Sequence, residues 1–158
     1  MNMTIKQIRR WAAAVAAICL LTLFLPLYGM TAFAATARIA FSDPTASVGS
    51  EINVKMKITS SDNLSTADIM LAYDPGSLEF IEGTNAEGGN GAVRVHGDGG
   101  GANTTTLAYD LKFKASAAGT SKITVTSQEI YDASSQIVTV DKQGESQVTV
   151  SALSSASK

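Results

Sequence analysis

Hydrophobic and polar residues alternate along most of the chain after residue 34, a spacing typical of β-strands with one side on a core. The clearest case is 51–60 (EINVKMKITS), in which every second residue from Ile52 to Ile58 is apolar. Further strands are predicted over 38–41, 67–74, 77–83, 92–97, 105–115, 120–127, 136–140 and 146–150. None of these segments has the spacing of an amphipathic helix, so an all-β domain is predicted.

The same alternation predicts which side chains face the core. The inward apolar residues are Ile39, Phe41, Ile52, Val54, Met56, Ile58, Ile69, Leu71, Tyr73, Val93, Val95, Leu107, Tyr109, Leu111 and Phe113. Short strands separated by turn signals, each with one apolar side, fit an antiparallel sandwich in which two facing sheets share one core.

The first 34 residues predict a secretory signal peptide. Basic residues between positions 6 and 10 precede an apolar run over 11–28, and Ala32-Phe33-Ala34 supplies the small residues of a cleavage site. The alternative is an uncleaved membrane anchor, since the apolar run approaches the length that spans a bilayer. Pro26 and the cleavage site favour removal after Ala34.

The predicted organisation is a signal peptide over 1–34, one β-domain over 35–151 and a Ser/Ala-rich tail over 152–158. Cys19 lies in the signal, so the domain has no disulfide and packing alone must hold it. Without the three signal cations, nine Lys and Arg face 14 Asp and Glu, a net charge of −5. This charge disfavours nucleic-acid binding, and we expect no membrane segment after signal cleavage.

No catalytic, metal-binding or cofactor-binding residues are predicted. The glycine-rich stretch 83–101 is not followed by a helix, as a phosphate-binding loop would be, and is interpreted as long loops between strands. Asp98 and Asn103 are too few oxygen donors for an EF-hand calcium loop. His96 is the only histidine, which excludes a zinc site built on several histidines, and no nucleophile motif accompanies it.

Two carboxylates in 67–80 (ADIMLAYDPGSLEF) have different expected roles. Asp68 faces outward from its strand. Asp74 begins a turn in which its carboxylate would accept backbone N–H bonds, while Pro75 fixes φ and Gly76 permits the reversal. Six residues of extended strand would hold the two carboxylates roughly 20 Å apart, so they are not a catalytic pair.

Three segments in this order resemble the cohesin domains of bacterial cellulosomes and related secreted scaffolds. They are SVGSEINVKMKI (47–58), LSTADIMLAYDPGSLEFIEG (64–83) and LAYDLKFKASAAGTSKITV (107–125), and the resemblance extends from Ala37 to Val150. It implies a nine-stranded antiparallel jelly-roll β-sandwich without catalytic activity. It also implies a partner, the dockerin, a small calcium-loaded helical module carried on enzymes. The calcium belongs to that partner, so no cofactor of this chain is implied.

In cohesins the dockerin binds one flat sheet face, and Thr66 and Asp68 match a polar residue and an Asp on that face. The chain departs from the family at AVRVHGDGGG (92–101), which replaces a more apolar and acidic segment. The predicted partner-binding residues are Thr66, Asp68, Met70, Ala72, Arg94, His96, Ala108, Asp110 and Lys112. The charged members of this set are expected to share one unusually charged face.

The leading hypothesis is a secreted, extracellular module that binds dockerins and so tethers polysaccharide-degrading enzymes. One alternative is a carbohydrate-binding module of similar fold with a polysaccharide as ligand. Such a module would need exposed aromatic rings on which sugars can stack. Only Tyr131, interpreted as a loop residue, is expected to be available for this stacking. A second alternative is a structural or adhesive cell-surface domain without a dedicated ligand.

Overall fold

The computed structural model describes residues 34–98 and 104–154. The predicted signal peptide, apart from Ala34, and the last residues of the predicted tail therefore lie outside the described part. The described residues contain eleven strands and no helix, so none that could cross a membrane. The strands are β1 (Thr36–Phe41), β2 (Thr45–Ser47), β3 (Glu51–Ser60), β4 (Leu64–Tyr73), β5 (Leu78–Gly83), β6 (Ala86–Gly89), β7 (Ala92–Asp98), β8 (Thr106–Ala115), β9 (Gly119–Asp132), β10 (Thr139–Gln143) and β11 (Glu145–Ser151).

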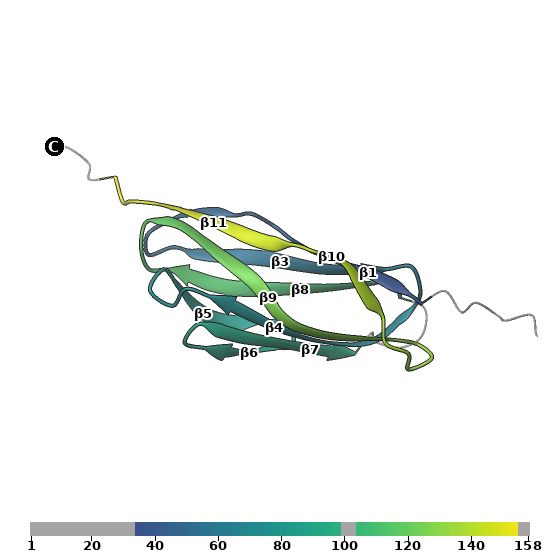
Figure 1. Cartoon of the computed structure of the whole chain (residues 1–158). Coiled ribbons are helices and arrows are strands. Elements are labelled where there is room, and N and C mark those ends of the chain that lie inside the picture. The colour runs from purple at the N-terminus through teal and green to yellow at the C-terminus, as the bar shows by residue number, and fades with distance from the viewer. Residues whose placement is uncertain (1–33, 99–103, 155–158) are drawn as a thin grey trace, which may run out of the picture. The chain divides into compact units, whose positions relative to one another are not determined.

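The strands form one continuous hydrogen-bonded sheet in the order β10-β1-β3-β8-β5-β6-β7-β4-β9-β11-β2. The sheet curls over, so that β3 and β8 lie in one layer and β4 and β7 in the other (Figure 1). The connection between β5 and β6 is narrow, since only Gly83 and Ala86 pair there. The all-β sandwich predicted from the alternation is confirmed.

Two details of the predicted fold are wrong. The described residues form eleven strands rather than nine, and the sheet is not purely antiparallel, because β1 pairs with β10 and β2 with β11 in parallel. The strand β2 lies where a turn was expected around Pro44. Proline has no N–H to donate to a neighbouring strand. The chain leaves β3 after Ser42, whose amide still donates to the Lys55 carbonyl, and resumes pairing beside β11.

The glycine-rich stretch is also less irregular than expected. Its first half forms β6, which pairs with β7 in a hairpin closed by Asn90 and Gly91. Both turn residues have positive φ, 52° and 95°, as a type I′ turn requires. Asn-Gly is a strong sequence signal for this turn. We interpreted the segment as a loop because the glycines of β6 leave no hydrophobic alternation to detect.

The core contains the predicted inward residues. All of them are buried except Phe41, which is partly buried and packs against the rest. The aromatic rings of Tyr73 on β4 and Phe80 on β5 meet the ring of Phe113 on β8 edge to face, at centroid distances of 5.2 and 5.4 Å. This contact joins the two layers through a fully buried side chain, whose truncation to Ala typically costs about 3–5 kcal/mol.

The turn after β4 is built on Asp74, as predicted. Its carboxylate accepts hydrogen bonds from the Gly76 amide at 2.9 Å and from the Ser77 hydroxyl at 2.6 Å. The Ser77 hydroxyl and the Gly76 amide hold the pKa of Asp74 below its usual value. Gly76 is not among the glycines with positive φ, so the predicted reason for a glycine there is wrong. A Cβ at this position would instead lie 3.3 Å from the Asp74 Oδ1 that the cap uses.

Candidate functional site

The outward side chains of β4, β6, β7 and β9 form an open surface that we name the β4 face. In its central row, Asp68 lies opposite His96 on β7 and opposite Glu129 on β9. In the next row, Met70 lies opposite Arg94. The members of the β4 face are Thr66, Asp68, Met70, Ala72, Glu87, Ala92, Arg94, His96, Asp98, Lys122, Thr124, Ser127, Glu129 and Tyr131.

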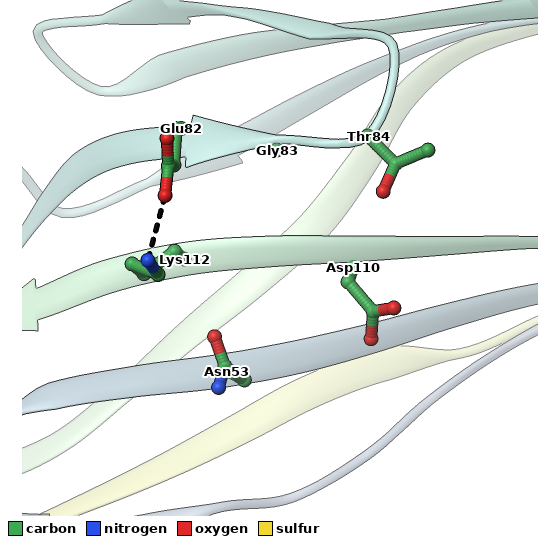
Figure 2. Close-up of a pocket in the computed structure, with 6 residues that line it drawn as sticks. All are labelled: Asn53, Glu82, Gly83, Thr84, Asp110 and Lys112. Atoms are coloured by element: carbon green, nitrogen blue, oxygen red, sulfur yellow. Dashed lines mark hydrogen bonds and ion pairs between the residues drawn. The ribbon is translucent and has the colours of Figure 1, made fainter.

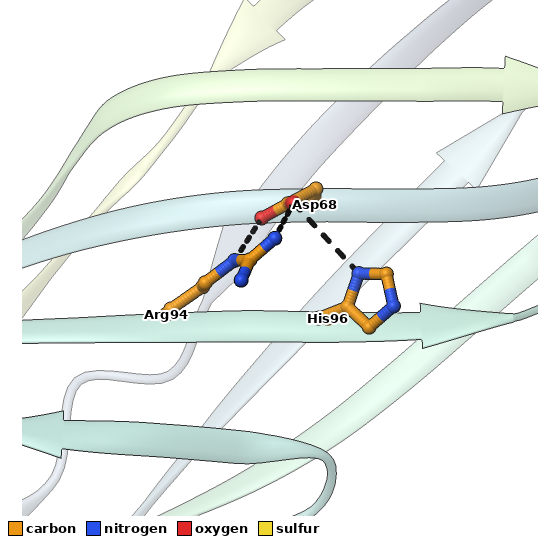
Figure 3. Close-up of polar contacts among 3 residues, drawn as sticks. All are labelled: Asp68, Arg94 and His96. Atoms are coloured by element: carbon orange, nitrogen blue, oxygen red, sulfur yellow. Dashed lines mark hydrogen bonds and ion pairs between the residues drawn. The ribbon is translucent and has the colours of Figure 1, made fainter.

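Asp68 is held by two side chains of β7 (Figure 3). Arg94 donates from Nε to Oδ1 at 3.0 Å and from Nη2 to Oδ2 at 2.5 Å. His96 Nδ1 lies 3.8 Å from the same Oδ2. Arg94 reaches Asp68 diagonally, since it is directly opposite Met70, and diagonal cross-strand neighbours are within reach of long side chains.

This contact shifts the ionisation of both partners toward the charged forms. The hydrogen bond from Arg94 is the main cause of the lowered pKa of Asp68, with the charges of Arg94 and His96 adding to it. The same hydrogen bond raises the pKa of Arg94. The side chains of Asp68 and Arg94 are 32% and 47% exposed, so the pair is open to solvent and accessible to a partner.

Sequence reasoning missed the contribution of β9 to this face. We expected that strand to end at residue 127 and placed Tyr131 in a loop, whereas β9 continues to Asp132 and Tyr131 pairs with Thr66. The register between β4 and β9 shifts beside Met70, which interrupts the alternation. Beyond the shift Ile130 is buried and Glu129 is exposed, a signal too short to predict a strand.

Three predicted site residues lie elsewhere. Ala108, Asp110 and Lys112 point outward from β8, which pairs with β3 and β5 rather than with β4 or β7. The expectation that Asp110 and Lys112 share one charged face with Asp68 is therefore wrong. Alternation predicts that these residues point away from the core, but it does not say which layer their strand joins.

The outward residues of β3, β5 and β8 form a second surface, which we name the β8 face. It carries a shallow depression of about 310 Å³ lined by Asn53, Glu82, Gly83, Thr84, Asp110 and Lys112 (Figure 2). Lys112 Nζ donates to Glu82 Oε1 at 2.6 Å across its floor. No aromatic ring lines this depression, so it offers no platform for stacking a sugar.

A metal centre is not apparent in residues 34–98 and 104–154. Nowhere among them do three His, Cys, Asp or Glu side chains come close enough together to hold an ion. The notable feature of this part of the chain is instead the β4 face, with a charged cluster beside small apolar side chains.

Comparison with solved structures places this fold among the cohesins. The non-cellulosomal cohesin from the archaeon Archaeoglobus fulgidus superposes with a TM-score of 0.60 at 21% identity, over 77% of this chain and 95% of that one. A cohesin module of a Clostridium perfringens family 33 glycoside hydrolase gives 0.61 at 10% identity, over 75% and 98%.

A third similar structure is the type I cohesin–dockerin complex Coh-OlpA-Doc918 from Clostridium thermocellum, with a TM-score of 0.64 at 17% identity, over 73% of this chain and 99% of that one. The sequence matches no protein-family profile and no curated protein. The chain thus has the cohesin fold, which is recognisable in three dimensions at identities of 10–21%.

Proposed function

We propose that this chain is a secreted, non-catalytic binding module that holds a dockerin-type helical module on its β4 face. The observation that carries the proposal is the combination of the cohesin fold with an open sheet face of small apolar and charged residues. A solved relative of this fold forms a cohesin–dockerin complex. The site would comprise Thr66, Asp68, Met70, Ala72, Arg94 and His96 on β4 and β7 together with the outward residues of β9.

The centre of the β4 face is suited to a closely packed helix. Ala72 lies opposite Ala92 on β7, and Met70 lies opposite Ser127 on β9. Short side chains let a helix backbone approach the sheet, while the flexible thioether of Met70 adapts to an uneven surface. Charged groups around this centre would set the register and speed the encounter, as rim charges commonly do.

The physiological role follows from the predicted location. Cleavage after Ala34 would release the domain outside the cell. There, a dockerin carried by a polysaccharide-degrading enzyme would be tethered through this module. The calcium of such a complex would reside in the dockerin, consistent with a binding face that presents mainly small and charged side chains.

Two matched substitutions test the proposal. Ala72→Arg places a long cation in the centre of the β4 face, and Ala108→Arg places the same side chain on the β8 face. Binding of each protein to a panel of calcium-loaded dockerin modules is measured by isothermal titration calorimetry. We expect at least one dockerin to bind the wild type and Ala108→Arg equally, and Ala72→Arg to lose about 100-fold in affinity or more.

Other results would contradict the proposed binding face or the proposed function. An equal loss of dockerin affinity in both variants, or a loss in Ala108→Arg alone, would show that the β4 face is not the binding site. If no dockerin binds while an insoluble polysaccharide retains the wild-type protein, the module is a carbohydrate-binding one and the proposal fails.

A further inference from the structure

Most of the basic residues that the structure describes have an acid beside them. Three of them form ion pairs across strands, and Lys55 and Lys114 lie opposite acids on neighbouring strands. The exceptions among the described residues are Arg38, Lys57 and Lys142. Their charged groups make no hydrogen bond or ion pair with any other described residue.

These three residues are neighbours in the sheet, on β1, β3 and β10. Arg38 lies directly opposite Lys142. It lies diagonally from Lys57, since that residue pairs with Ala40. All three side chains are exposed, and we name them the Arg38 patch. Like charges on facing positions weaken a sheet, so the fold itself gains no stability from this cluster.

The surroundings of the Arg38 patch do little to neutralise it. The register between β1 and β10 shifts beside Arg38 and leaves Asp141 as an extra residue. Across β3 and β8, the described rows that carry Arg38 and Lys57 hold only Thr and Ala side chains. A positive patch therefore persists on a domain whose net charge after removal of the signal is −5.

A depression of about 390 Å³ lies beside the guanidinium of this patch. Its lining includes the hydroxyls of Thr36, Thr59 and Ser61 and the carboxylate of Asp141, next to Arg38. A guanidinium binds a carboxylate through two parallel hydrogen bonds, and hydroxyl and carboxylate oxygens accept bonds from hydroxyl groups. The ligand that fits carries an anion and hydroxyl donors on one small unit, as the ring of a uronic acid does.

Neutral sugars and polyphosphates fit this depression less well. No aromatic ring of the described residues lines it, so a neutral sugar finds no platform for stacking. A densely charged polyphosphate is repelled by Asp141 and by the acidic domain as a whole. A uronic acid avoids both difficulties, because its carboxylate pairs with a cation and one of its hydroxyls donates to Asp141.

We propose that the Arg38 patch binds an acidic polysaccharide that carries carboxylates on successive sugar rings. Adjacent strands lie about 4.8 Å apart, a separation close to the length of one ring. A chain that crosses β10, β1 and β3 therefore brings successive carboxylates to the cations of the patch. These strands belong to the layer opposite the β4 face, so the polysaccharide and a helical partner can be bound at the same time.

The test measures binding of soluble polygalacturonate by isothermal titration calorimetry, with its neutral methyl ester as the control ligand. We expect the wild type to bind polygalacturonate, more weakly as salt increases, and not to bind the ester. Arg38→Gln should lower the affinity about tenfold. Arg38→Lys should lower it less, since the charge remains and the planar fork is lost. Lys114→Gln removes a cation that lies opposite acids and should leave the affinity unchanged.

Asp141→Ala separates a sugar ligand from a simple polyanion. It should weaken binding of polygalacturonate, whose hydroxyl loses its acceptor, and strengthen any binding of inorganic polyphosphate, because a repelling charge is gone. No binding of polygalacturonate, an equal loss in Lys114→Gln, or stronger binding of both polymers by Asp141→Ala would overturn the inference. Ala72→Arg should leave polygalacturonate binding unchanged, so a failure of the proposed dockerin site is recognised separately.

Discussion

The two outer faces of the sandwich are built from similar alternating strands but distribute their charges in opposite ways. On the β8 face, Lys114 lies between Glu51 on β3 and Glu79 on β5. Asp110 similarly lies opposite Lys55. The described charged residues of this face are the bases Lys55, Lys57, Lys112 and Lys114 and the acids Glu51, Glu79, Glu82 and Asp110, a net charge of zero.

The β4 face lacks this balance. Each face has a cross-strand ion pair, Lys112–Glu82 on one and Arg94–Asp68 on the other. Only on the β4 face, among the described residues of the two, does an acid lie directly opposite another acid, Asp68 beside Glu129. Opposite charges across strands stabilise a sheet and like charges weaken it. The charges of the β8 face thus balance one another, whereas the β4 face keeps an excess of acids.

The largest expected effect is a loss of dockerin affinity, and it comes from reversing the charge of Arg94 in the ion pair of the β4 face. Arg94→Glu removes the partner of Asp68 and adds another acid to the β4 face. The introduced carboxylate and that of Asp68 then repel each other. We expect the affinity for a bound dockerin to fall about 100-fold, because displaced charges disturb both register and approach. The measurement is calorimetric titration together with thermal unfolding.

Lys112→Glu is the matched control, because it breaks the corresponding pair on the β8 face. It should lower the unfolding temperature by an amount similar to Arg94→Glu but leave dockerin affinity unchanged. A comparable loss of affinity in both proteins would show that the two faces do not differ in function.

An effect of intermediate size, on thermal stability, is expected from a substitution of Asp74, which belongs to neither face. Asp74→Ala removes the acceptor of the Gly76 amide and the Ser77 hydroxyl, so the turn between β4 and β5 loses its cap. The unfolding temperature should fall by several degrees, as loss of a turn-capping carboxylate commonly causes. Affinity measured well below that temperature should be unchanged. A selective loss of binding, without loss of stability, would contradict the structural role.

The smallest effect concerns stability at acid pH. The pKa values of Asp68 and Glu82 are both lowered, chiefly by hydrogen bonds from Arg94 and Lys112. A carboxyl whose folded pKa lies below its unfolded value stabilises the protein above the unfolded value. That contribution is lost as the pH falls through the folded pKa. Stability should therefore decrease from about pH 4.5 downward.

Chemical denaturation between pH 2 and 7 checks this expectation. Asp68→Asn and Glu82→Gln should each flatten the acid limb of the stability curve, one through the β4 face and the other through the β8 face. The flattening should be smaller for Glu82→Gln, since the Glu82 side chain is 66% exposed and that of Asp68 only 32%. Solvent and salt screen an exposed pair more strongly. The reverse order would mean that the Asp68–Arg94 contact is not maintained in solution.

Much of the fold follows from the alternation of side chains. Period-two patterns placed Ile52, Val54, Leu111 and Phe113 in the core correctly, because a strand with one apolar side can bury only that side. The strands β2 and β6 escaped prediction because three or four residues, two of them glycines in β6, carry too little pattern. For a related reason, the interrupted alternation of β9 did not allow Glu129 to be predicted as a residue of the β4 face.

The sequence by itself determined which side of each predicted strand faces the core, the cap at Asp74 and the outward direction of Asp68. Only the tertiary structure decided which outward residues share a surface. Ala108, Asp110 and Lys112 have the same outward pattern as Thr66, Asp68 and Met70, yet their strands lie in different layers. Side-chain direction depends on neighbours in the chain, whereas a common face depends on pairing between strands far apart in sequence. For the same reason, Arg94 and Glu129 lie on opposite sides of Asp68 only in the folded sheet.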